Sequence, residues 1–369
     1  MDLRRVPMSN LLNEAREIIN KVDKEMAELF VERMRAAEMV ARHKKEHGLQ
    51  VFDPVREAEV IRRNSSLIES DELRAYYVNF LEKTMAVSRA YQTKLLEGMR
   101  IAYCGTEGAF AHIAARKLFP TAKKIAFGSF DDAYASVVSG ECDVAVLPIE
   151  NSYNGEVGQV TDLLFSGSLY VNAITELAIS QDLLGVPGAK LADIKEVVSH
   201  PQALGQCKGY IKDHGFVEIE YSNTALAAGY VRDRGDKSVA AIASEEAAEI
   251  FGLSVLERNI NASRSNTTRF AVLSRSENKH TAQDMRVHTL LLFTVRNEAG
   301  ALAKAIEIIG KHGFNMRSLR SRPMKELLWQ YYFYVEAEGN INTDEGKAMM
   351  QELSEYCDRL KSVGTYTKN

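Results

Sequence analysis

Five consecutive residues in the second half of the chain, Asn266–Phe270, bring together groups that could handle a small anionic substrate. Asn266 supplies an amide, Thr267 and Thr268 supply hydroxyls, and Arg269 supplies a fixed positive charge. A hydroxyl can donate a hydrogen bond to a departing group, and a guanidinium can pair with a carboxylate. The pentapeptide therefore predicts a binding cleft in which a small acid loses a hydroxyl.

The composition of the 369-residue chain is that of an ordinary globular protein with two or three domains. Its net charge of −4 gives no reason to expect nucleic acid or an anionic membrane as a partner. No run approaches the roughly 18 apolar residues of a membrane span, and no apolar segment follows Arg4 and Arg5 as in a secretory signal. The cysteines lie too far apart for a zinc or redox motif, so we expect reduced thiols in a cytoplasmic protein and no metal site: Cys104, Cys142, Cys207 and Cys357.

The first hundred residues predict three helices. Apolar residues recur at helical spacing, without Pro or Gly, from Leu11 to about His47. After Gly48, Asp53 and Pro54 resemble a capped helix start that leads to about Ser66, and a third helix is expected over residues 70–97. The first helix, at about 35 residues, greatly exceeds the mean length of about 11–12. Because it cannot bury its apolar face alone, we expect an antiparallel bundle completed by a second chain.

Charged residues on these helices could bind a dianion. Arg33 and Lys44 lie about three turns apart on nearly the same face of the first helix, so they could hold the two ends of one ligand. Arg16 lies roughly 25 Å from Arg33 along the axis and could reach such a site only from a partner chain. The other two helices offer polar residues at helical spacing: Asp53, Arg56 and Glu57, then Ser88 and Gln92. The alternative is a charged dimerisation domain in which Asp53 only caps a helix.

Residues 11–97 resemble the all-helical chorismate mutase family, whose intertwined dimer shares its active sites between chains. The match includes every position at which that family places its substrate ligands: Arg16, Arg33, Lys44, Asp53, Arg56, Glu57, Ser88 and Gln92. The resemblance implies a Claisen rearrangement of chorismate to prephenate, which positioning and electrostatics must catalyse. It also implies roles. Arg16, Arg33 and Arg56 would hold carboxylates, Lys44 and Gln92 would stabilise the breaking ether oxygen, and Glu57 would accept the substrate hydroxyl.

After Gly98 the hydrophobic pattern changes to strands alternating with helices, which predicts an α/β fold. A strand over 99–104, a turn at Gly105–Gly108 and a helix over 110–118 form a potential anion site at the helix start. The turn lacks the dinucleotide fingerprint and the P-loop lysine, so we expect a bound carboxylate and no nucleotide cofactor. The further strands expected are Val144–Ile149, Tyr170–Leu177, Glu196–Ser199, Val217–Tyr221, Val239–Ile242 and Phe270–Ser274.

Polar clusters follow three of these strands, at the sheet edge where α/β proteins bind ligands. They are Glu150-Asn151-Ser152 with Asn154-Gly155, His200-Pro201-Gln202 with Gln206, and Ser222-Asn223-Thr224. Each alone could be a turn or a helix cap. Their shared place at strand ends, together with Asn266–Phe270, favours one common cleft.

From Ile101 to Leu273 the chain resembles prephenate dehydratase. The shared motifs, in the family's order, are GTEGAF at 105–110, LPIENSYNG at 147–155, SHPQALGQC at 199–207 and NTTRF at 266–270. The resemblance implies two α/β subdomains around a cleft, and the conversion of prephenate to phenylpyruvate, water and carbon dioxide. The family often has hydroxyl residues where this chain has Ala109 and Ala111.

The same resemblance implies roles for the cleft residues. Thr268 would donate a hydrogen bond to the departing hydroxyl, and Asn151 and Gln206 would orient the substrate. Arg269 would counter a substrate carboxylate, or alternatively form a salt bridge with Glu150 or Asp162. Glu150 and Asn266 complete the expected substrate-binding set, and Phe270 is expected in the core.

The C-terminal part predicts a ferredoxin-like βαββαβ unit after a polar linker over 274–285. The expected elements are strand 288–295, helix 301–312, strands 315–321 and 329–336, helix 344–360 and a short strand over 363–366. The segments Gly300-Ala301-Leu302 and Arg320-Ser321-Arg322-Pro323 resemble ACT modules, which pair and bind amino acids at their seam. The resemblance implies phenylalanine as an effector, although the family usually has Glu where this chain has Arg320. Alternatively, the module only dimerises the protein.

Together these features predict a mutase domain over 1–98, a dehydratase domain over 99–275 and an ACT domain over 286–369. The chain is thereby identified as a member of the bifunctional chorismate mutase–prephenate dehydratase family. It is expected to form a homodimer or a dimer of dimers and to need no cofactor. The alternative is a two-lobed solute or amino-acid sensor with a helical dimerisation arm.

Overall fold

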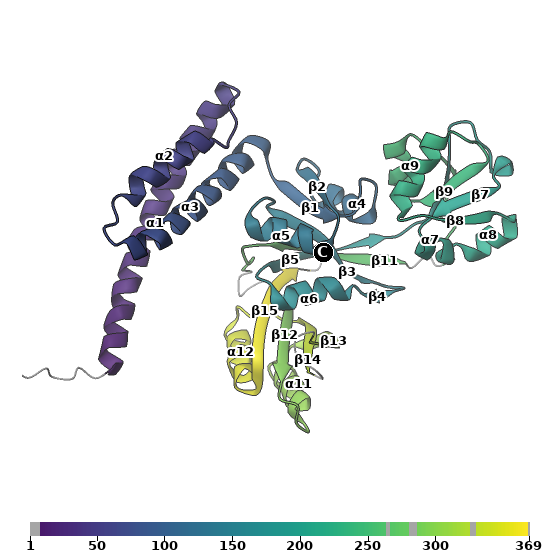
Figure 1. Cartoon of the computed structure of the whole chain (residues 1–369). Coiled ribbons are helices and arrows are strands. Elements are labelled where there is room, and N and C mark those ends of the chain that lie inside the picture. Colours follow the sequence, from purple (N-terminus) through teal and green to yellow (C-terminus); the bar gives the residue numbers. More distant parts are fainter. Residues whose placement is uncertain (1–7, 263–265, 280–285, 325–329, 368–369) are drawn as a thin grey trace, which may run out of the picture. The chain divides into compact units, whose positions relative to one another are not determined.

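The computed structural model describes residues 8–262, 266–279, 286–324 and 330–367 (Figure 1). The chain divides into two compact units, Met1–Gly98 and Met99–Asn369. We call them the helical unit and the α/β unit. Among the described helices, none combines the length and the apolar character needed to cross a membrane.

The helical unit contains α1 (Met8–Glu46), α2 (Pro54–Ser65) and α3 (Asp71–Glu97), which confirms the three predicted helices. Local chemistry sets their ends. The Asp53 carboxylate accepts a hydrogen bond from the Arg56 backbone N–H at 3.0 Å, and the Ser70 hydroxyl accepts one from the Leu73 N–H at 3.3 Å. Gly98, with φ of 80°, ends α3.

Much of the apolar face of α1 has no cover within the helical unit. Ile18 is 65% exposed and Met39 is 71% exposed, whereas few positions, such as Ala37 and Ala41, are buried. Figure 1 shows the N-terminal half of α1 extending past α2 and α3. The exposed large apolar residues of α1 are Leu11, Leu12, Ile18, Ile19, Val22, Met26, Leu29, Phe30, Val31, Met39 and Val40.

The α/β unit begins with lobe 1, a mixed sheet in the order β2-β1-β3-β11-β5, with β4 paired to β3. β1 runs parallel to β2 and β3, whereas β11 runs antiparallel to both β3 and β5. The strands are β1 (Arg100–Cys104), β2 (Lys123–Phe127), β3 (Val144–Asn151), β4 (Gly155–Glu156), β5 (Tyr170–Ala178) and β11 (Thr267–Ser274), and the helices are α4 (Phe110–Leu118), α5 (Phe130–Ser139) and α6 (Gly158–Ser166).

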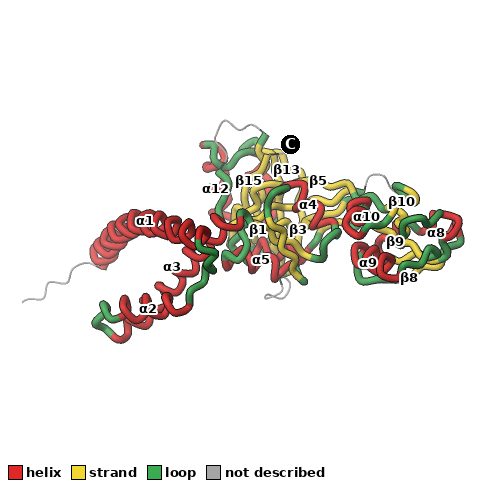
Figure 2. The backbone as a smooth tube through the Cα atoms, turned by 90° about the horizontal axis from the view of Figure 1, so that it is seen from above, coloured by secondary structure: helices red, strands yellow, loops and turns green. Residues whose placement is uncertain are grey.

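Lobe 2 lies between β5 and β11 in the sequence and has its own sheet, in the order β10-β6-β9-β7-β8. Figure 2 shows the strands of this lobe flanked by helices. The strands are β6 (Asp182–Gly185), β7 (Glu196–Ser199), β8 (Val217–Glu220), β9 (Val239–Ala243) and β10 (Ser254–Glu257), and the helices are α7 (Pro201–Gln206), α8 (Lys208–His214), α9 (Thr224–Arg234) and α10 (Glu245–Phe251), with a short 3₁₀ turn at Leu191–Asp193. The chain therefore leaves lobe 1 after β5 and returns to it at β11.

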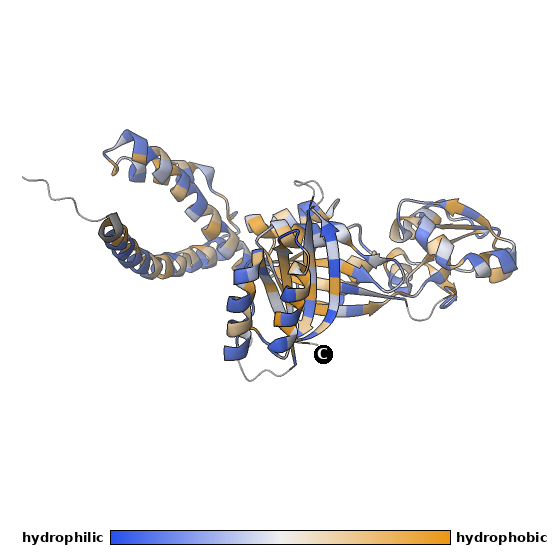
Figure 3. Cartoon of the chain, turned by 90° about the horizontal axis from the view of Figure 1, so that it is seen from below, coloured by the Kyte–Doolittle hydropathy of each residue, from blue (hydrophilic) through white to orange (hydrophobic). Residues whose placement is uncertain are grey.

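The C-terminal sheet is antiparallel, in the order β13-β14-β12-β15, and its elements follow the predicted βαββαβ order. One face packs on α11 and α12, and the other shares a core with lobe 1 through Leu290, Tyr332 and Val363. Figure 3 shows hydrophobic residues gathered on the strands inside the α/β unit. The elements are β12 (Val287–Val295), α11 (Ala301–Lys311), β13 (Asn315–Pro323), β14 (Tyr331–Glu338), α12 (Asp344–Tyr356) and β15 (Cys357–Thr367).

Several predicted boundaries were wrong. β2, β6 and β10 were missed, because each is short and mixes polar with apolar residues. The last helix ends at Tyr356 instead of Leu360, and β15 begins at Cys357, because pairing with β12 over Val287–Val295 overrides a helical pattern that has no Gly or Pro to stop it. Trp329 and the end of the predicted linker fall outside the described residues.

None of the four cysteines forms a disulfide bond in the structure. Cys142 and Cys207 are buried, and Cys104 and Cys357 are half-buried. Burial raises the pKa of Cys207 to about 12.

Candidate functional site

A cavity of about 570 Å³ lies between the two lobes of the α/β unit and is lined by residues from all four sequence motifs. Lobe 1 contributes Asn151 from the end of β3 and Thr268 from the start of β11. Lobe 2 contributes His200, the N-cap of α7, and Gln206, the last residue of α7. Gln181 lies in the connection that follows β5 and leads into lobe 2. The polar clusters that follow the strands are thus brought to one cleft.

Asn151 is the centre of the hydrogen bonding in this cleft. Its Nδ2 donates to Thr268 Oγ1 at 2.9 Å and to Asn266 Oδ1 at 2.8 Å. Its Oδ1 accepts from the backbone N–H groups of Tyr153 and Asn154 at 3.0 and 2.9 Å. Among the described residues no group accepts a hydrogen bond from the Thr268 hydroxyl, so its O–H is available to donate to a ligand.

The register of β3 and β11 explains this contact, because Thr268 is paired with Asn151 across the two strands. The strand begins at Thr267, three residues earlier than predicted, so the two threonines belong to the sheet and not to a loop. Thr268 is only 9% exposed, which limits competition from water for its hydroxyl. Phe270 is buried in the core of lobe 1, as expected, and its ring also borders the cavity.

Gln206 connects lobe 2 to the same network. Its Oε1 accepts from Asn266 Nδ2 at 3.2 Å and from Gln181 Nε2 at 3.4 Å. Gln181 is 3% exposed, and its Oε1 has no hydrogen-bond partner among the described residues. The sequence alone did not point to Gln181, because it lies in a short connection without a recognisable motif.

The glycine-containing turn and the start of α4 form one wall of the cavity. Gly108, at φ of 84°, donates its N–H to Nδ1 of buried His112 at 3.1 Å, and burial lowers the pKa of that imidazole. Ala109 occupies the N-cap position of α4 and has no side chain that can cap the helix. The first backbone N–H groups of α4 therefore have no side-chain cap. Ala109, Phe110 and Ala111, at this helix start, line the cavity.

Arg269 and Glu150, both expected to bind substrate, do not line the cavity. Successive side chains on a strand point to opposite faces, so Thr268 and Asn151 face the cleft while Arg269 and Glu150 face the C-terminal sheet. Arg269 Nη1 pairs with Glu150 Oε2 at 3.1 Å, which confirms the alternative salt bridge. The described residues that line the cavity include no Lys or Arg, and those with ionisable side chains are Cys104, Glu156 and His200.

In the helical unit, the structure brings Arg33 of α1 to α3. The Arg33 guanidinium donates to Ser88 Oγ in a close contact and to the Thr84 carbonyl at 3.4 Å. Burial lowers the pKa of Arg33. Gln92, one turn beyond Ser88, is 8% exposed, and its Oε1 has no hydrogen-bond partner in the described part of the chain. Half-buried Arg33 thus contacts buried Ser88, and buried Gln92 follows one turn farther along α3.

The other predicted residues of the helical unit lie outside this group of three residues or already have partners. Lys44 Nζ donates to the Val51 carbonyl, and Glu57 pairs closely with Arg89. Arg56 forms an exposed pair with Glu59 at 2.6 Å. Arg16 is exposed on the uncovered half of α1, and Asp53 caps α2. One copy of the helical unit therefore does not gather all of the predicted ligands.

These features define a class: a multidomain α/β protein with a polar cleft that has no Lys or Arg among its described lining residues, a separate helical unit and a C-terminal ferredoxin-like layer. The chorismate mutase type II model matches residues 15–93, and the prephenate dehydratase model matches residues 101–278. The bifunctional chorismate mutase/prephenate dehydratase of Aquifex aeolicus is 30% identical over 97% of this chain and 98% of the relative. That of Escherichia coli K12 is 31% identical over 97% of this chain and 96% of the relative. The chain belongs to the bifunctional chorismate mutase/prephenate dehydratase family.

Solved structures similar to the chain cover 73% of it. One is prephenate dehydratase from Arthrobacter aurescens in complex with L-Phe, with a TM-score of 0.66 and 25% identity over 90% of that chain. Another is described as a novel type of quorum-quenching acylase, with a TM-score of 0.68 and 32% identity over 98% of that chain.

Proposed function

We propose that this chain is a cytoplasmic enzyme of phenylalanine biosynthesis that carries out two successive reactions. The helical unit, 1–98, rearranges chorismate to prephenate. The cleft between the lobes of 99–275 converts prephenate to phenylpyruvate. The observation that carries the second assignment is the Thr268 hydroxyl, held by Asn151 with its own proton free, at the wall of a cavity of about 570 Å³.

In the dehydratase reaction, the ring loses carbon dioxide and the hydroxyl together, and aromatisation provides the driving force. The electrons of the breaking C–C bond enter the ring as the C–O bond breaks, and the departing hydroxyl takes up a proton to become water. The Thr268 O–H donates to that hydroxyl as negative charge develops on it. The amide of Asn151 holds the Thr268 oxygen and compensates for the weak acidity of the hydroxyl.

The substrate carboxylates need donors other than Lys or Arg, because the described cavity wall has neither. The uncapped N–H groups at the start of α4 supply such donors beside Ala109 and Ala111. Gln206, Asn266 and Gln181 supply amide groups from the opposite side. In this chain, backbone N–H groups at the start of α4 would bind the carboxylate that hydroxyl side chains often bind in the family.

We expect Asn151→Ala to lower the kcat of prephenate dehydration about 30-fold, because Thr268 and the turn at Tyr153–Asn154 both lose their anchor. Steady-state kinetics with prephenate measures this. A matched control is Asn172→Ala on β5, since the Asn172 amide bonds Ser274 Oγ at the far end of β11 at 2.7 Å. Equal losses for both variants would show that Asn151 acts only through the stability of the sheet.

For the mutase, we propose an active site shared between two chains. Half-buried Arg33 and buried Ser88 and Gln92 form its inner part, and Lys44 adds a second cation from α1. The exposed apolar face of α1 supports a dimer, because a second copy would cover side chains that otherwise contact water. The partner's α1 would then supply Arg16. Asp53, Arg56 and Glu57 complete the proposed set and would have to exchange their present partners for substrate.

We also propose that the C-terminal sheet, 286–369, is an ACT domain that binds phenylalanine. The complex of the Arthrobacter aurescens relative with L-Phe supports this. Gly300, at φ of 86°, turns the chain into α11 and Ala301 and Leu302 follow it, as in the expected effector segment. The second segment, Arg320–Pro323, lies on β13, which is an edge strand of its sheet and has one edge open for pairing with another copy.

Calorimetric titration with L-phenylalanine tests this assignment. We expect saturable binding and a fall in dehydratase rate with unchanged mutase rate, because the effector segments belong to the α/β unit. D-Phenylalanine is the matched control, since an amino-acid site reads the arrangement of the ammonium and carboxylate groups. If L-phenylalanine gave neither a heat of binding nor inhibition, the C-terminal sheet would serve only to dimerise the protein.

The similarity to a described acylase suggests a second reaction, acyl transfer. Such a reaction needs a nucleophile with an adjacent base. Thr268 is bonded by the amide of Asn151, which cannot take up a proton, and no carboxylate or imidazole of the described residues hydrogen-bonds its hydroxyl. The geometry therefore favours dehydration.

A time course with chorismate distinguishes the enzyme from a sensor and from an acylase. Loss of chorismate absorbance followed by phenylpyruvate formation is the expected result. Binding of chorismate and prephenate without turnover would instead indicate a sensor with a helical dimerisation arm.

A further inference from the structure

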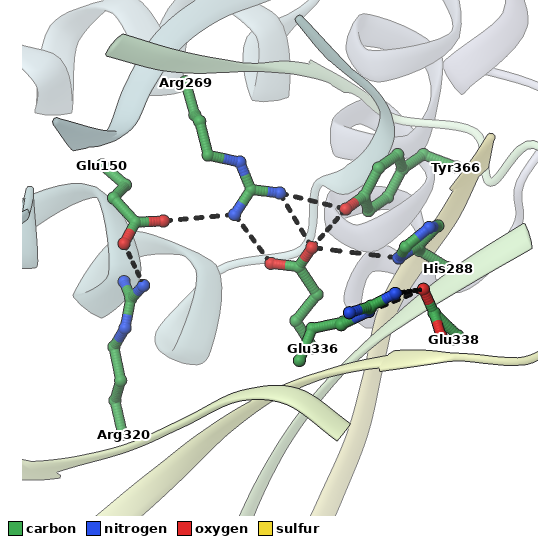
Figure 4. A network of polar contacts seen from close by, with 8 residues as sticks. Glu150, Arg269, His288, Arg320, Glu336, Glu338 and Tyr366 are labelled. Carbon is green, nitrogen blue, oxygen red and sulfur yellow. Dashed lines mark hydrogen bonds and ion pairs between the residues drawn. The ribbon is translucent and has the colours of Figure 1, made fainter. Parts of the chain in front are cut away.

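Arg269 and Glu150 lie on the strand pair that carries Thr268 and Asn151. Figure 4 shows the side chain of Arg269 pointing toward Glu336 and Tyr366 of the C-terminal sheet. The register pairs Thr268 with Asn151 and Arg269 with Glu150, and a bulge follows between Arg269 and Phe270. A bulge breaks the regular ladder and re-aims the side chains beside it. Phe270 pairs with Pro148, so the extra residue is Ile149 of β3, just before Glu150 and Asn151. Backbone pairing alone therefore defines the orientation of Asn151, which holds Thr268, less firmly than it would in a regular strand.

The C-terminal sheet holds Arg269 directly. Its Nη1 and Nη2 bind the two oxygens of Glu336 on β14, each at 2.8 Å, and its Nη2 donates to the Tyr366 hydroxyl of β15 at 3.0 Å. Tyr366 also donates to Glu336 in a close contact, and His288 Nδ1 lies 4.0 Å from the same carboxylate. Glu336 is 4% exposed. Arg269 therefore forms a bidentate salt bridge with Glu336, which fixes the direction of its side chain.

The electrostatics of this contact are those of a buried pair. Burial opposes the charge on Arg269, but its hydrogen bonds to Glu336 and the charge of that carboxylate raise the pKa of the guanidinium above its ordinary value. Burial likewise opposes the charge on Glu336, but its hydrogen bonds from Arg269 and Tyr366, together with the charge of Arg269, outweigh burial and lower the pKa of the carboxyl. Removing either partner leaves the other charge buried and uncompensated.

Arg320 makes a second connection from the same sheet. Its guanidinium pairs closely with Glu150 and lies 5.8 Å from the centre of the Tyr334 ring. Glu150 is thereby held between Arg269 and Arg320. Arg320 thus gives the C-terminal sheet a second ionic contact with the strand pair of the cleft.

We propose that Glu336 is a positioning residue for the dehydratase reaction. By binding Arg269 on the reverse face of β11, it holds this strand against the bulged β3, so that Thr268 stays on Asn151 and points into the cleft. Arg320 assists by holding Glu150 on the paired strand. The inference rests on the proposed function of the cleft, and it makes dehydration depend on a residue of the C-terminal sheet.

The test is Glu336→Gln in the full chain, which keeps the size of the side chain and removes its charge. We expect the kcat for prephenate to fall about 100-fold with little change in KM, because a small displacement of a catalytic group costs rate more than binding. Mutase activity in the same preparation should be unchanged. The matched control is Glu338→Gln, two residues along β14, where the carboxylate pairs with Arg317 and Asn315 at the surface. We expect this control to keep the wild-type kcat.

A second comparison separates positioning from general damage. In a Thr268→Ala background, Glu336→Gln should cause almost no further loss of rate, because the group that it positions is already absent. A role in stability alone would reduce the rate by the same factor in both backgrounds, and that outcome would overturn the inference. So would a wild-type kcat in a Glu336→Gln chain that melts cooperatively.

Arg320→Ala keeps the inference testable should Glu336→Gln unfold the α/β unit. Its side chain is about a quarter exposed, so we expect the fold to survive and the kcat to fall about 10-fold. An unchanged kcat in this variant, with Glu336→Gln unfolded, would overturn the inference. A wild-type chain that binds but does not convert prephenate would overturn the proposed function as well, so the two failures are distinguishable.

Discussion

Thr268→Ala is expected to lower the kcat for prephenate about 1000-fold and to leave chorismate mutase activity at the wild-type level. The Thr268 hydroxyl is the only described cavity group that combines a free donor proton with an oxygen held by Asn151 at 2.9 Å. General-acid assistance of this kind contributes factors of about 10²–10⁴. The mutase should be unaffected, since its residues belong to the separate helical unit.

Thr268→Ser is the matched control, because it keeps the hydroxyl and removes only a methyl group. We expect it to keep most of the wild-type rate. Thr267→Ala is a second control, since Thr267 is not among the residues that line the cavity. Loss of both activities in Thr268→Ala would contradict the assignment of the mutase to the helical unit and of the dehydratase to the α/β unit. Full dehydratase activity in that variant would remove Thr268 from the mechanism.

Mixing chains that carry Arg16→Ala with chains that carry Arg33→Ala should restore mutase activity that neither has alone. We expect each single variant to lose about 1000-fold in kcat, because each removes a fixed cation from the proposed dianion site. In a mixed dimer, one shared site has lost both arginines and the other has both intact. Random exchange of equal amounts should therefore restore about a quarter of the wild-type sites.

The mutase rate after mixing, denaturation and refolding measures this restoration. A mixture of Arg35→Ala and Arg33→Ala chains is the control, because Arg35 is not part of the proposed site. Since sites with Arg35→Ala are active, that mixture should show the simple average of its components. Activity of the Arg16→Ala and Arg33→Ala mixture that stays at the level of the separate variants would show that each site is built within one chain.

The helical unit was largely predictable, because its signals are local. Asp53 and Pro54 start α2, Gly98 ends α3, and the apolar spacing of α1 predicted a helix that the structure extends to Met8–Glu46. The short strands β6 and β10 were not predicted, because neither DLLG nor SVLE alternates apolar with polar residues as VEIE of β8 does. The end of α12 was missed for a related reason. No local breaker separates it from β15, whose pairing with β12 decides the boundary.

The candidate cleft was predictable as a set of residues but not as a geometry. Sequence motifs pointed to Asn151, Gln206 and Thr268, and the structure gathers them around one cavity. Gln181 was missed, because its role arises from a crossover between lobes that gives no local pattern. In the helical unit, Arg16 and Lys44 do not join the cluster of Arg33 and Ser88 in a single chain, since that would require either a partner or a ligand to draw them in.

The sequence by itself determined which chemical groups this protein has and the order of its helices and most of its strands, because caps, glycines and hydrophobic periodicity act between near neighbours in the chain. Only the tertiary structure decided where those groups point. Arg269 follows Thr268 by one residue, yet Thr268 faces the cleft and Arg269 binds Glu336, 67 residues later in the sequence. The direction of a strand side chain depends on register, bulges and the layer packed on each face, and these are properties of the folded sheet.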